Sequence, residues 1–215
     1  YKEAVVLCIY NPFQLTQAAG DRTKSKLNRD SKNILIIIIF QFTFSQVSFA
    51  TNSNKSTTSQ TVEIFLLNKL EEDRYFCLDI RGYKTRAIVS KGLQAHTCYS
   101  YEGTIAVDQG FDRDLLGVGK FRVSAFNSCM QRKNVKIPSP LALVPCNSKK
   151  LQKFFLSSEG LIQPEGQTNL CVTAASGIAR KGRGGTPVHQ IRRLRLDYCK
   201  KELRSYQSWG IRPSE

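Results

Sequence analysis

The sequence predicts an all-β fold assembled from three copies of one cystine-bridged strand unit. Six of its seven cysteines fall into three successive pairs, and a Gln-x-aromatic triplet follows the second cysteine of each pair. The triplets are Gln109-Gly110-Phe111, Gln152-Lys153-Phe154 and Gln207-Ser208-Trp209. No stretch after Ala50 keeps a helical period of apolar residues over three turns, so an α/β fold is not expected.

Each unit contains the same order of elements. The first cysteine lies in one short apolar strand, at residues 76–80, 128–130 and 170–173. The second cysteine ends another, at residues 92–98, 140–146 and 195–199, and the Gln-x-aromatic strand closes the unit. Three such units of roughly 40 to 55 residues predict a six-stranded barrel capped by three hairpins. The residues expected in its core are Leu78, Ile80, Leu93, Leu141, Leu143, Phe154, Leu170, Val172 and Trp209.

The region before these units has the layout of a signal peptide. An apolar run at residues 33–44 follows several basic residues and precedes the small residues Ser48 and Ala50, which suit a signal peptidase. An uncleaved anchor and a buried strand are the alternatives. We therefore expect a secreted protein, extracellular or periplasmic, with no membrane span in the mature chain. The expected divisions are a non-native or upstream extension (1–32), a signal peptide (33–50), a polar linker (51–61) and the folded region (62–213), with units at about 62–114, 115–160 and 161–213.

Six cysteines lie downstream of the expected cleavage point. An even number in a secreted chain indicates disulfides, and six cysteines permit fifteen pairings. If each unit closes its own bridge, one pairing remains. It joins Cys77 with Cys98, Cys129 with Cys146, and Cys171 with Cys199.

The unit resembles the repeat of the ricin B-chain (QxW) lectin family, which carries Cys-x-Asp, a Gln-x-aromatic-x-Cys strand and a terminal Gln-x-Trp. The resemblance covers about residues 62–212 and implies a β-trefoil with pseudo-threefold symmetry, stapled by one disulfide per repeat. This chain departs from the pattern because two triplets end in phenylalanine. A long insertion around residues 180–195 also leaves the third register open, since residues 185–189 resemble the strand before the second cysteine.

The resemblance also implies one sugar site, in the first repeat. Sugar recognition requires a polar acceptor for adjacent hydroxyls and a flat ring for the apolar face of the pyranose. Asp79 matches the acidic acceptor, and His96 stands where an aromatic ring stacks. The other repeats have Gln131 and Thr173 in place of Asp79, so they are expected to have lost sugar binding or changed specificity. The implied carbohydrate-binding residues are Asp79, Gln94, His96, Asp108 and Gln109.

Two features of this site have alternative interpretations. Histidine is a poorer stacking platform than tryptophan, so Tyr99 or Tyr101 is a candidate to replace His96. Asp79 and Gln109 are also of the residue types that tie loops to backbone groups without touching a ligand.

Positive charge gives a second candidate function. Lys and Arg outnumber Asp and Glu by 32 to 17, which favours anionic partners. In the third unit a basic stretch predicts a site for anionic surface polysaccharide or another polyanion, with a solvated loop as the alternative. Few aromatic residues are interleaved with it, which disfavours nucleic acid. The candidate anion-binding residues are Arg180, Lys181, Arg183, Arg192, Arg193 and Arg195.

Enzyme motifs do not occur in this sequence. With only His96 and His189 there is no histidine cluster at zinc-ligand spacing, and Gly117-Val118-Gly119-Lys120 lacks the flanking residues of a phosphate loop. We expect no enzyme activity, cofactor or metal. The sequence therefore predicts a secreted carbohydrate-binding lectin module, with a basic adhesion module for anionic glycans as the alternative and an inert scaffold as the third interpretation.

Overall fold

A computed structural model describes residues 60–213 of the chain. The expected extension, the signal peptide and most of the linker lie outside the described residues. Within the described range the secondary structure is β strand apart from short 3-10 turns and one five-residue α-helix. The all-β class is thus confirmed. In this part of the chain, no helix has the length and apolar character that a membrane crossing requires.

Each predicted unit contributes four strands to the fold. The first unit contains β1 (Thr61–Leu66), β2 (Phe76–Ile80), β3 (Leu93–Thr97) and β4 (Phe111–Asp112). The second contains β5 (Arg122–Val123), β6 (Ser128–Arg132), β7 (Ser139–Pro145) and β8 (Phe154–Leu156). The third contains β9 (Ile162–Pro164), β10 (Leu170–Ala174), β12 (Gln190–Tyr198) and β13 (Trp209–Pro213), with β11 (Arg180–Lys181) inserted.

Short helical segments connect these strands. The α-helix is α1 (Arg113–Gly117), and its N-terminus is capped by the side chain of Asp112. The 3-10 turns are η1 (Lys84–Arg86), η2 (Val89–Lys91), η3 (Ser100–Glu102), η4 (Ser124–Phe126), η5 (Lys150–Gln152) and η6 (Lys201–Tyr206).

The first and last strands of the three units are joined in a ring by strand pairs and by two isolated bridges. Strand β1 pairs with β4, β4 with β5, β8 with β9, and β13 with β1. Isolated bridges at Lys120–Lys153 and Leu161–Ser208 join the segments between them. The ring encloses the apolar side chains, and the nine predicted core residues are all buried, with at most 5% exposed surface each.

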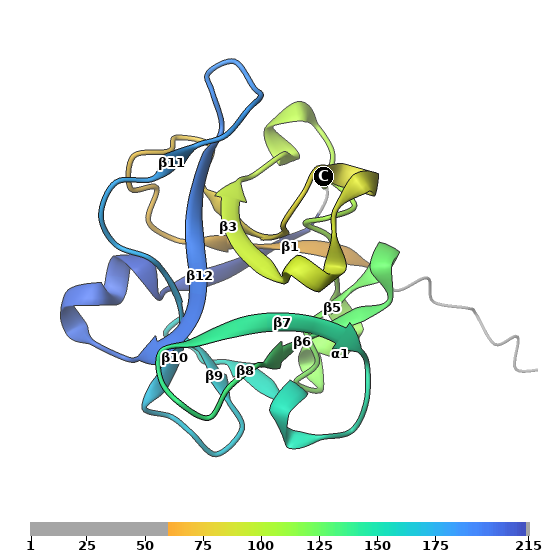
Figure 1. Ribbon diagram of the computed structural model, residues 1–215, viewed down its shortest axis with the longest axis vertical. Helices are drawn as coiled ribbons and strands as arrows, with labels where there is room; N and C mark the ends of the chain where they lie inside the picture. The colour runs from red at the N-terminus through yellow and green to blue at the C-terminus, as the bar shows by residue number, and fades with distance from the viewer. Residues whose placement is uncertain (1–59, 214–215) are drawn as a thin grey trace, which may run out of the picture. The chain divides into compact units, whose positions relative to one another are not determined.

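The two middle strands of each unit form a hairpin: β2–β3, β6–β7 and β10–β12. Each hairpin carries one disulfide, Cys77–Cys98, Cys129–Cys146 or Cys171–Cys199, which is the pairing expected from the repeat. Strand β12 also pairs with β3 and with β7, so the three hairpins meet along it (Figure 1).

The glutamine of each Gln-x-aromatic triplet is buried and forms hydrogen bonds with backbone groups at the end of its own hairpin. Gln109 accepts a hydrogen bond from the backbone N–H of Tyr99 (2.8 Å) and donates to the carbonyl of Thr97 (3.0 Å) and to the Asp79 carboxylate (3.0 Å). Gln152 and Gln207 make the equivalent three bonds in the second and third units. The motif therefore satisfies the backbone groups on both sides of the second cysteine.

The register of the third unit, left open by the sequence, is that of β12. Cys171 lies opposite Asp197, and residues 190–195, which were assigned to the insertion, belong to the strand. The inserted loop therefore spans residues 175–189 and folds back so that β11 pairs with the start of β12 (Figure 1).

Candidate functional site

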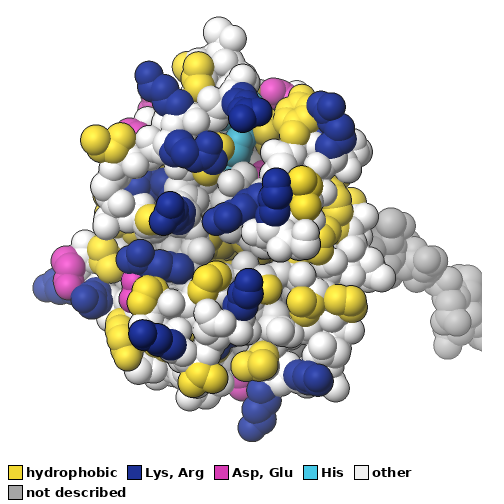
Figure 2. All heavy atoms as spheres, in the orientation of Figure 1, with side chains coloured by type: hydrophobic (Ala, Val, Ile, Leu, Met, Phe, Trp, Pro, Cys, Tyr) yellow, Lys and Arg dark blue, Asp and Glu magenta, His cyan; other side chains and the backbone are white. Residues whose placement is uncertain are grey.

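A cleft of about 1210 Å³ opens between the first and third units. One wall comes from β3 and residues 81–91, and the other comes from the inserted loop and the start of β12. The pairing of β3 with β12 places Gln94 opposite Arg193 and His96 opposite Ile191 at its base. Figure 2 shows this face of the molecule, where lysine and arginine side chains surround a histidine.

The residues of the expected sugar site come together, but in two layers. Gln94 and His96 line the cleft, whereas Asp79 lies beneath it with 1% of its surface exposed. The Asp79 carboxylate accepts hydrogen bonds from Gln94 Nε2 (2.8 Å) and from Gln109 Nε2 (3.0 Å). Burial raises the pKa of Asp79 well above its ordinary value, and the charge of Asp108 raises it further. Asp79 thus holds two amides in place.

Asp108 is also buried rather than in the cleft wall. Its Oδ2 accepts the backbone N–H of Lys84, which anchors the loop that forms one wall. Its Oδ1 is buried and has no hydrogen-bond partner among residues 60–213. Burial raises the pKa of Asp108, while the hydrogen bonds from backbone N–H groups lower it.

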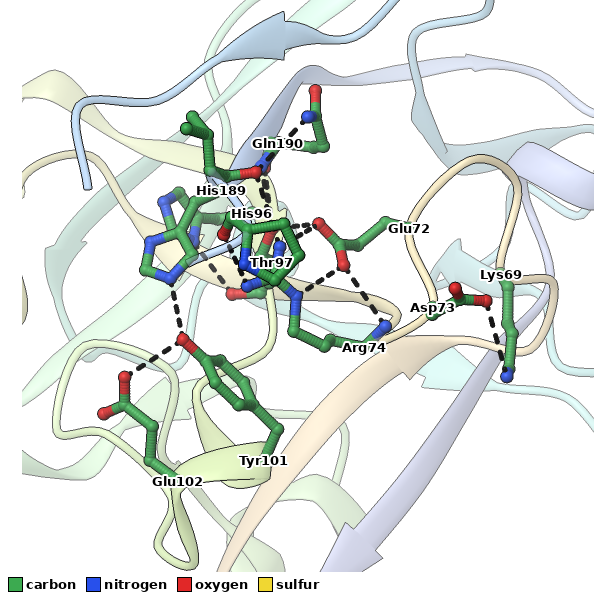
Figure 3. Close-up of polar contacts among 12 residues, drawn as sticks. Lys69, Glu72, Asp73, Arg74, His96, Thr97, Tyr101, Glu102, His189 and Gln190 are labelled. Atoms are coloured by element: carbon green, nitrogen blue, oxygen red, sulfur yellow. Dashed lines mark hydrogen bonds and ion pairs between the residues drawn. The ribbon is translucent and has the colours of Figure 1, made fainter. Parts of the chain in front are cut away.

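Aromatic rings form the floor of the cleft. The His96 ring stacks on Tyr99, with centroids 5.1 Å apart and planes inclined by 29°. The His189 ring stands edge-on to both, 5.1 Å from each centroid. Tyr101 places its hydroxyl 2.9 Å from His189 Nε2 (Figure 3). The sequence offers Tyr99 or Tyr101 as a stacking platform in place of His96; in the structure the Tyr99 ring stacks on the His96 ring.

A hydrogen-bond network holds the inserted loop against the first unit (Figure 3). Glu72 accepts from Arg74 Nε (2.6 Å) and from the Thr97 hydroxyl (2.7 Å). The same hydroxyl accepts from the backbone N–H of Gln190 (2.7 Å). Arg74 also donates to the carbonyl of Pro187 (2.9 Å). These residues escaped sequence analysis because no motif marks them and their contacts to the inserted loop join residues 93 and 113 positions apart.

Both histidines are held in the neutral form at neutral pH. Burial lowers the pKa of His96 to about 4, despite a hydrogen bond to the Thr97 carbonyl that raises it. Burial and the charge of Arg74 lower the pKa of His189 as well. The only sequence signal for His189 was the similarity of residues 185–189 to a strand of the repeat.

The rim of the cleft carries cations that form no ion pair with any carboxylate among residues 60–213. All of these residues are exposed. The one acidic residue of the lining, Glu102, is occupied by Lys84 (3.1 Å). The potential in the cleft is therefore positive. The unpaired rim cations are Arg81, Arg86, Lys91, Arg180, Arg183 and Arg193.

The predicted anion-binding residues divide into two groups. Arg180, Arg183 and Arg193 belong to the rim cations, whereas Lys181 lies outside the lining. Arg192 faces the cleft but is 4% exposed, because it donates two 2.6 Å bonds to Glu71 and two more to backbone carbonyls. Arg195 lies outside the lining and pairs with Asp197 (2.8 Å). Sequence analysis missed the first-unit cations, because only the β3–β12 pairing brings them to this cleft.

One group of metal-ligand residue types occurs in the described part of the chain, Glu63 with Cys77 and Cys98. The two sulfurs form a disulfide with each other and therefore offer no thiolate.

Comparisons with known proteins bear on the fold. No protein-family model matches the chain, and no curated protein sequence does. Among solved structures, the chain is similar to the mdaA-1 domain, with a TM-score of 0.52, 16% identity, and coverage of 71% of this chain and 89% of that domain. The β-trefoil lectin of the Vibrio vulnificus hemolysin/cytolysin, solved with N-acetyl-D-lactosamine bound, has a TM-score of 0.43 and 16% identity over 74% of this chain and 97% of the lectin.

Proposed function

We propose that this chain is a secreted β-trefoil carbohydrate-binding module that binds acidic glycans in the cleft between its first and third units. Three observations support the trefoil: four strands per unit, a ring of first and last strands, and one cystine-bridged hairpin per unit. The three disulfides also suit an oxidising, extracytoplasmic environment.

The observation that carries the ligand assignment is the combination of aromatic rings and unpaired cations in one cleft. The rings of His96 and Tyr99, 5% and 3% exposed, form a largely buried aromatic floor beneath the rim. Arginines at the rim match carboxylate and sulfate groups, which guanidinium binds through two parallel hydrogen bonds. The cleft volume of about 1210 Å³ exceeds the range of about 300–1,000 Å³ typical of small-molecule pockets, which favours an oligosaccharide ligand.

The acidic-glycan assignment is better supported than a neutral-sugar site at Asp79. The Asp79 carboxylate is buried and already accepts from two amides, so a sugar hydroxyl reaches it only if one of these bonds breaks. In the proposal, Asp79 positions Gln94, and Gln94 and His96 make the polar contacts of the first unit.

The test is calorimetric titration of the full chain with a heparin-derived hexasaccharide and with uncharged maltohexaose. We expect the charged ligand to bind, with an affinity that falls steeply as salt rises, because charge pairs at an exposed rim are screened. The double substitution Arg180→Ser with Arg193→Ser should weaken binding by about tenfold or more, since two charge-assisted contacts are lost.

The matched control removes the same charge elsewhere. Lys149→Ser with Lys150→Ser changes two exposed cations of the second unit, outside the cleft. An equal loss of affinity in both double variants would mean that binding follows net charge rather than the cleft. Salt-insensitive binding of maltohexaose that depends on Asp79 would favour the neutral-sugar site instead.

A further inference from the structure

We propose that His96 and His189 together form the seat for an anionic group of the bound glycan, and that their protonation strengthens its binding at acid pH. This inference rests on the proposed acidic-glycan function. Both side chains line the floor of the cleft beneath the cationic rim, and they come from opposite walls, His96 from β3 and His189 from the end of the inserted loop (Figure 3).

Hydrogen bonding determines which nitrogen of His96 carries its proton. His96 Nδ1 lies 2.8 Å from the carbonyl oxygen of Thr97, and a carbonyl only accepts. The neutral ring therefore keeps its proton on Nδ1. Its Nε2 has no hydrogen-bond partner among the described residues and takes up the second proton when the ring becomes charged.

The same argument applies to His189 through its tyrosine partner. The Tyr101 hydroxyl donates its single proton to Glu102 Oε1 (3.1 Å), so its oxygen is left to accept from His189 Nε2 at 2.9 Å. The neutral His189 ring thus keeps its proton on Nε2, and Nδ1 has no partner in the described range. Protonation gives each ring one new N–H group that has no acceptor among the described residues and can donate to a ligand.

The inserted loop holds the His189 ring in place. A Cβ atom added to Gly185 would lie 2.3 Å from two atoms of that ring, and Gly185 has a φ of +88°. The backbone of Gly182 also donates to the carbonyl of His189 (2.7 Å). The glycines of this loop therefore let the backbone wrap closely around His189, which positions the ring before a ligand arrives.

The arginine, lysine and glutamate neighbours of the two rings keep their charges between pH 5 and 8. Arg74 and Lys84 stay protonated, and their charges oppose histidine protonation. Glu72 and Glu102 favour it, and their pKa values are held below the ordinary range. The remaining neighbours are Tyr99, Tyr101 and the rim cations, together with Asp79 and Asp108, whose raised pKa values call for a separate control.

A bound anion offsets the burial that keeps these rings neutral. If contact with a sulfate returns the pKa of His96 from about 4 to the ordinary value of about 6.5, linkage strengthens binding at pH 5 by roughly thirtyfold relative to pH 8. The direction follows from the sign of this change, because a ligand that raises a pKa binds more tightly to the protonated form.

The experiment titrates the full chain with a dextran sulfate oligosaccharide at pH 8 and pH 5, at constant ionic strength. This probe carries no carboxylate, so its own charge does not change over the range. We expect at least tenfold tighter binding at pH 5. Histidine ring proton shifts in NMR spectra, followed against pH with and without the probe, should show both pKa values rising on binding.

Conservative variants separate protonation from structure. His96→Asn keeps a donor toward the Thr97 carbonyl, and His189→Gln keeps a donor toward the Tyr101 hydroxyl. The double variant should lose the tightening between pH 8 and pH 5, so that its affinity no longer depends on pH, whatever that affinity is at pH 8. Asp108→Asn, which removes a titrating carboxyl beneath the floor, should keep the pH dependence.

Each outcome bears on one of the two proposals. Binding at pH 8 that does not tighten at pH 5, or tightening that survives in the double histidine variant, overturns the histidine seat and leaves the glycan function standing. Histidine pKa values that do not rise when the probe binds overturn the seat independently of how the variants fold. Failure of the parent to bind the probe at either pH overturns the glycan function itself.

Discussion

At the scale of single residues, the fold tolerates two buried carboxyl groups, Asp79 and Asp108, under the cleft. Both have raised pKa values, chiefly through burial. The folded state therefore binds protons more tightly than the unfolded chain. Their contribution to stability is fully present below the ordinary aspartate pKa of about 4 and is lost as pH rises through the folded values.

Asp108→Asn should accordingly stabilise the protein at neutral pH. Asparagine retains an oxygen for the N–H of Lys84 and removes a buried charge that raises the pKa of Asp79. We expect a gain of about 1 kcal/mol at pH 7, a rise in Tm of about 2–4 °C, and a smaller gain at pH 4. Thermal unfolding followed by circular dichroism measures this. Asp73→Asn, whose side chain is 98% exposed, is the control, and an equal Tm change there would contradict the argument.

At the scale of elements, each hairpin is held by a disulfide and by one buried glutamine. In the third unit Gln207 bonds the N–H of Lys200, the carbonyl of Tyr198 and the hydroxyl of Thr173. Its side chain thus replaces backbone hydrogen bonds that the strands cannot make where the hairpin ends. Loss of the Gln207 side chain should weaken the β10–β12 hairpin first. The pairing of β12 with β3 and with β7 should weaken with it.

Gln207→Ala should destabilise the protein by about 2–3 kcal/mol, because the buried Thr173 hydroxyl and two partly buried backbone groups lose a hydrogen-bond partner. Urea unfolding measures the loss as a lower midpoint. The matched control is Gln190→Ala, because the Gln190 side chain makes one weak bond at the surface, to the carbonyl of Val188 at 3.3 Å. For Gln190→Ala we expect the free energy of unfolding to change by less than about 0.5 kcal/mol. A similar loss of stability in both variants would show that the three hydrogen bonds of Gln207 are not the cause.

At the scale of the whole molecule, three disulfides support a small core. They close loops with sequence separations of 21, 17 and 28 residues. Each contributes roughly 3 kcal/mol on the loop-entropy account, so together they contribute about 9 kcal/mol. This is comparable with the total stability of about 5–15 kcal/mol that an ordinary domain possesses.

Reduction should therefore unfold the protein at 37 °C. The only tryptophan, Trp209, is buried at the ring closure and donates to the carbonyl of Val172 (2.8 Å). Its fluorescence should shift to the red when a phosphine reductant is added and return on reoxidation. Replacing Cys129 and Cys146 alone by serine should lower the urea midpoint without complete unfolding. Unchanged fluorescence in the fully reduced protein would show that the core suffices.

The sequence alone determined the all-β class, the buried core and the division into cystine-bridged units. These properties depend on local alternation, on cysteine order and on a triplet that recurs, and each is readable within one unit. The tertiary structure decided that Asp79 lies beneath the floor, that Arg192 is committed to Glu71, and that His189 meets His96. The positions of Arg192 and His189 follow from the pairing of β12 with β3 across about 95 residues, and local patterns carry no information about a register between such distant strands.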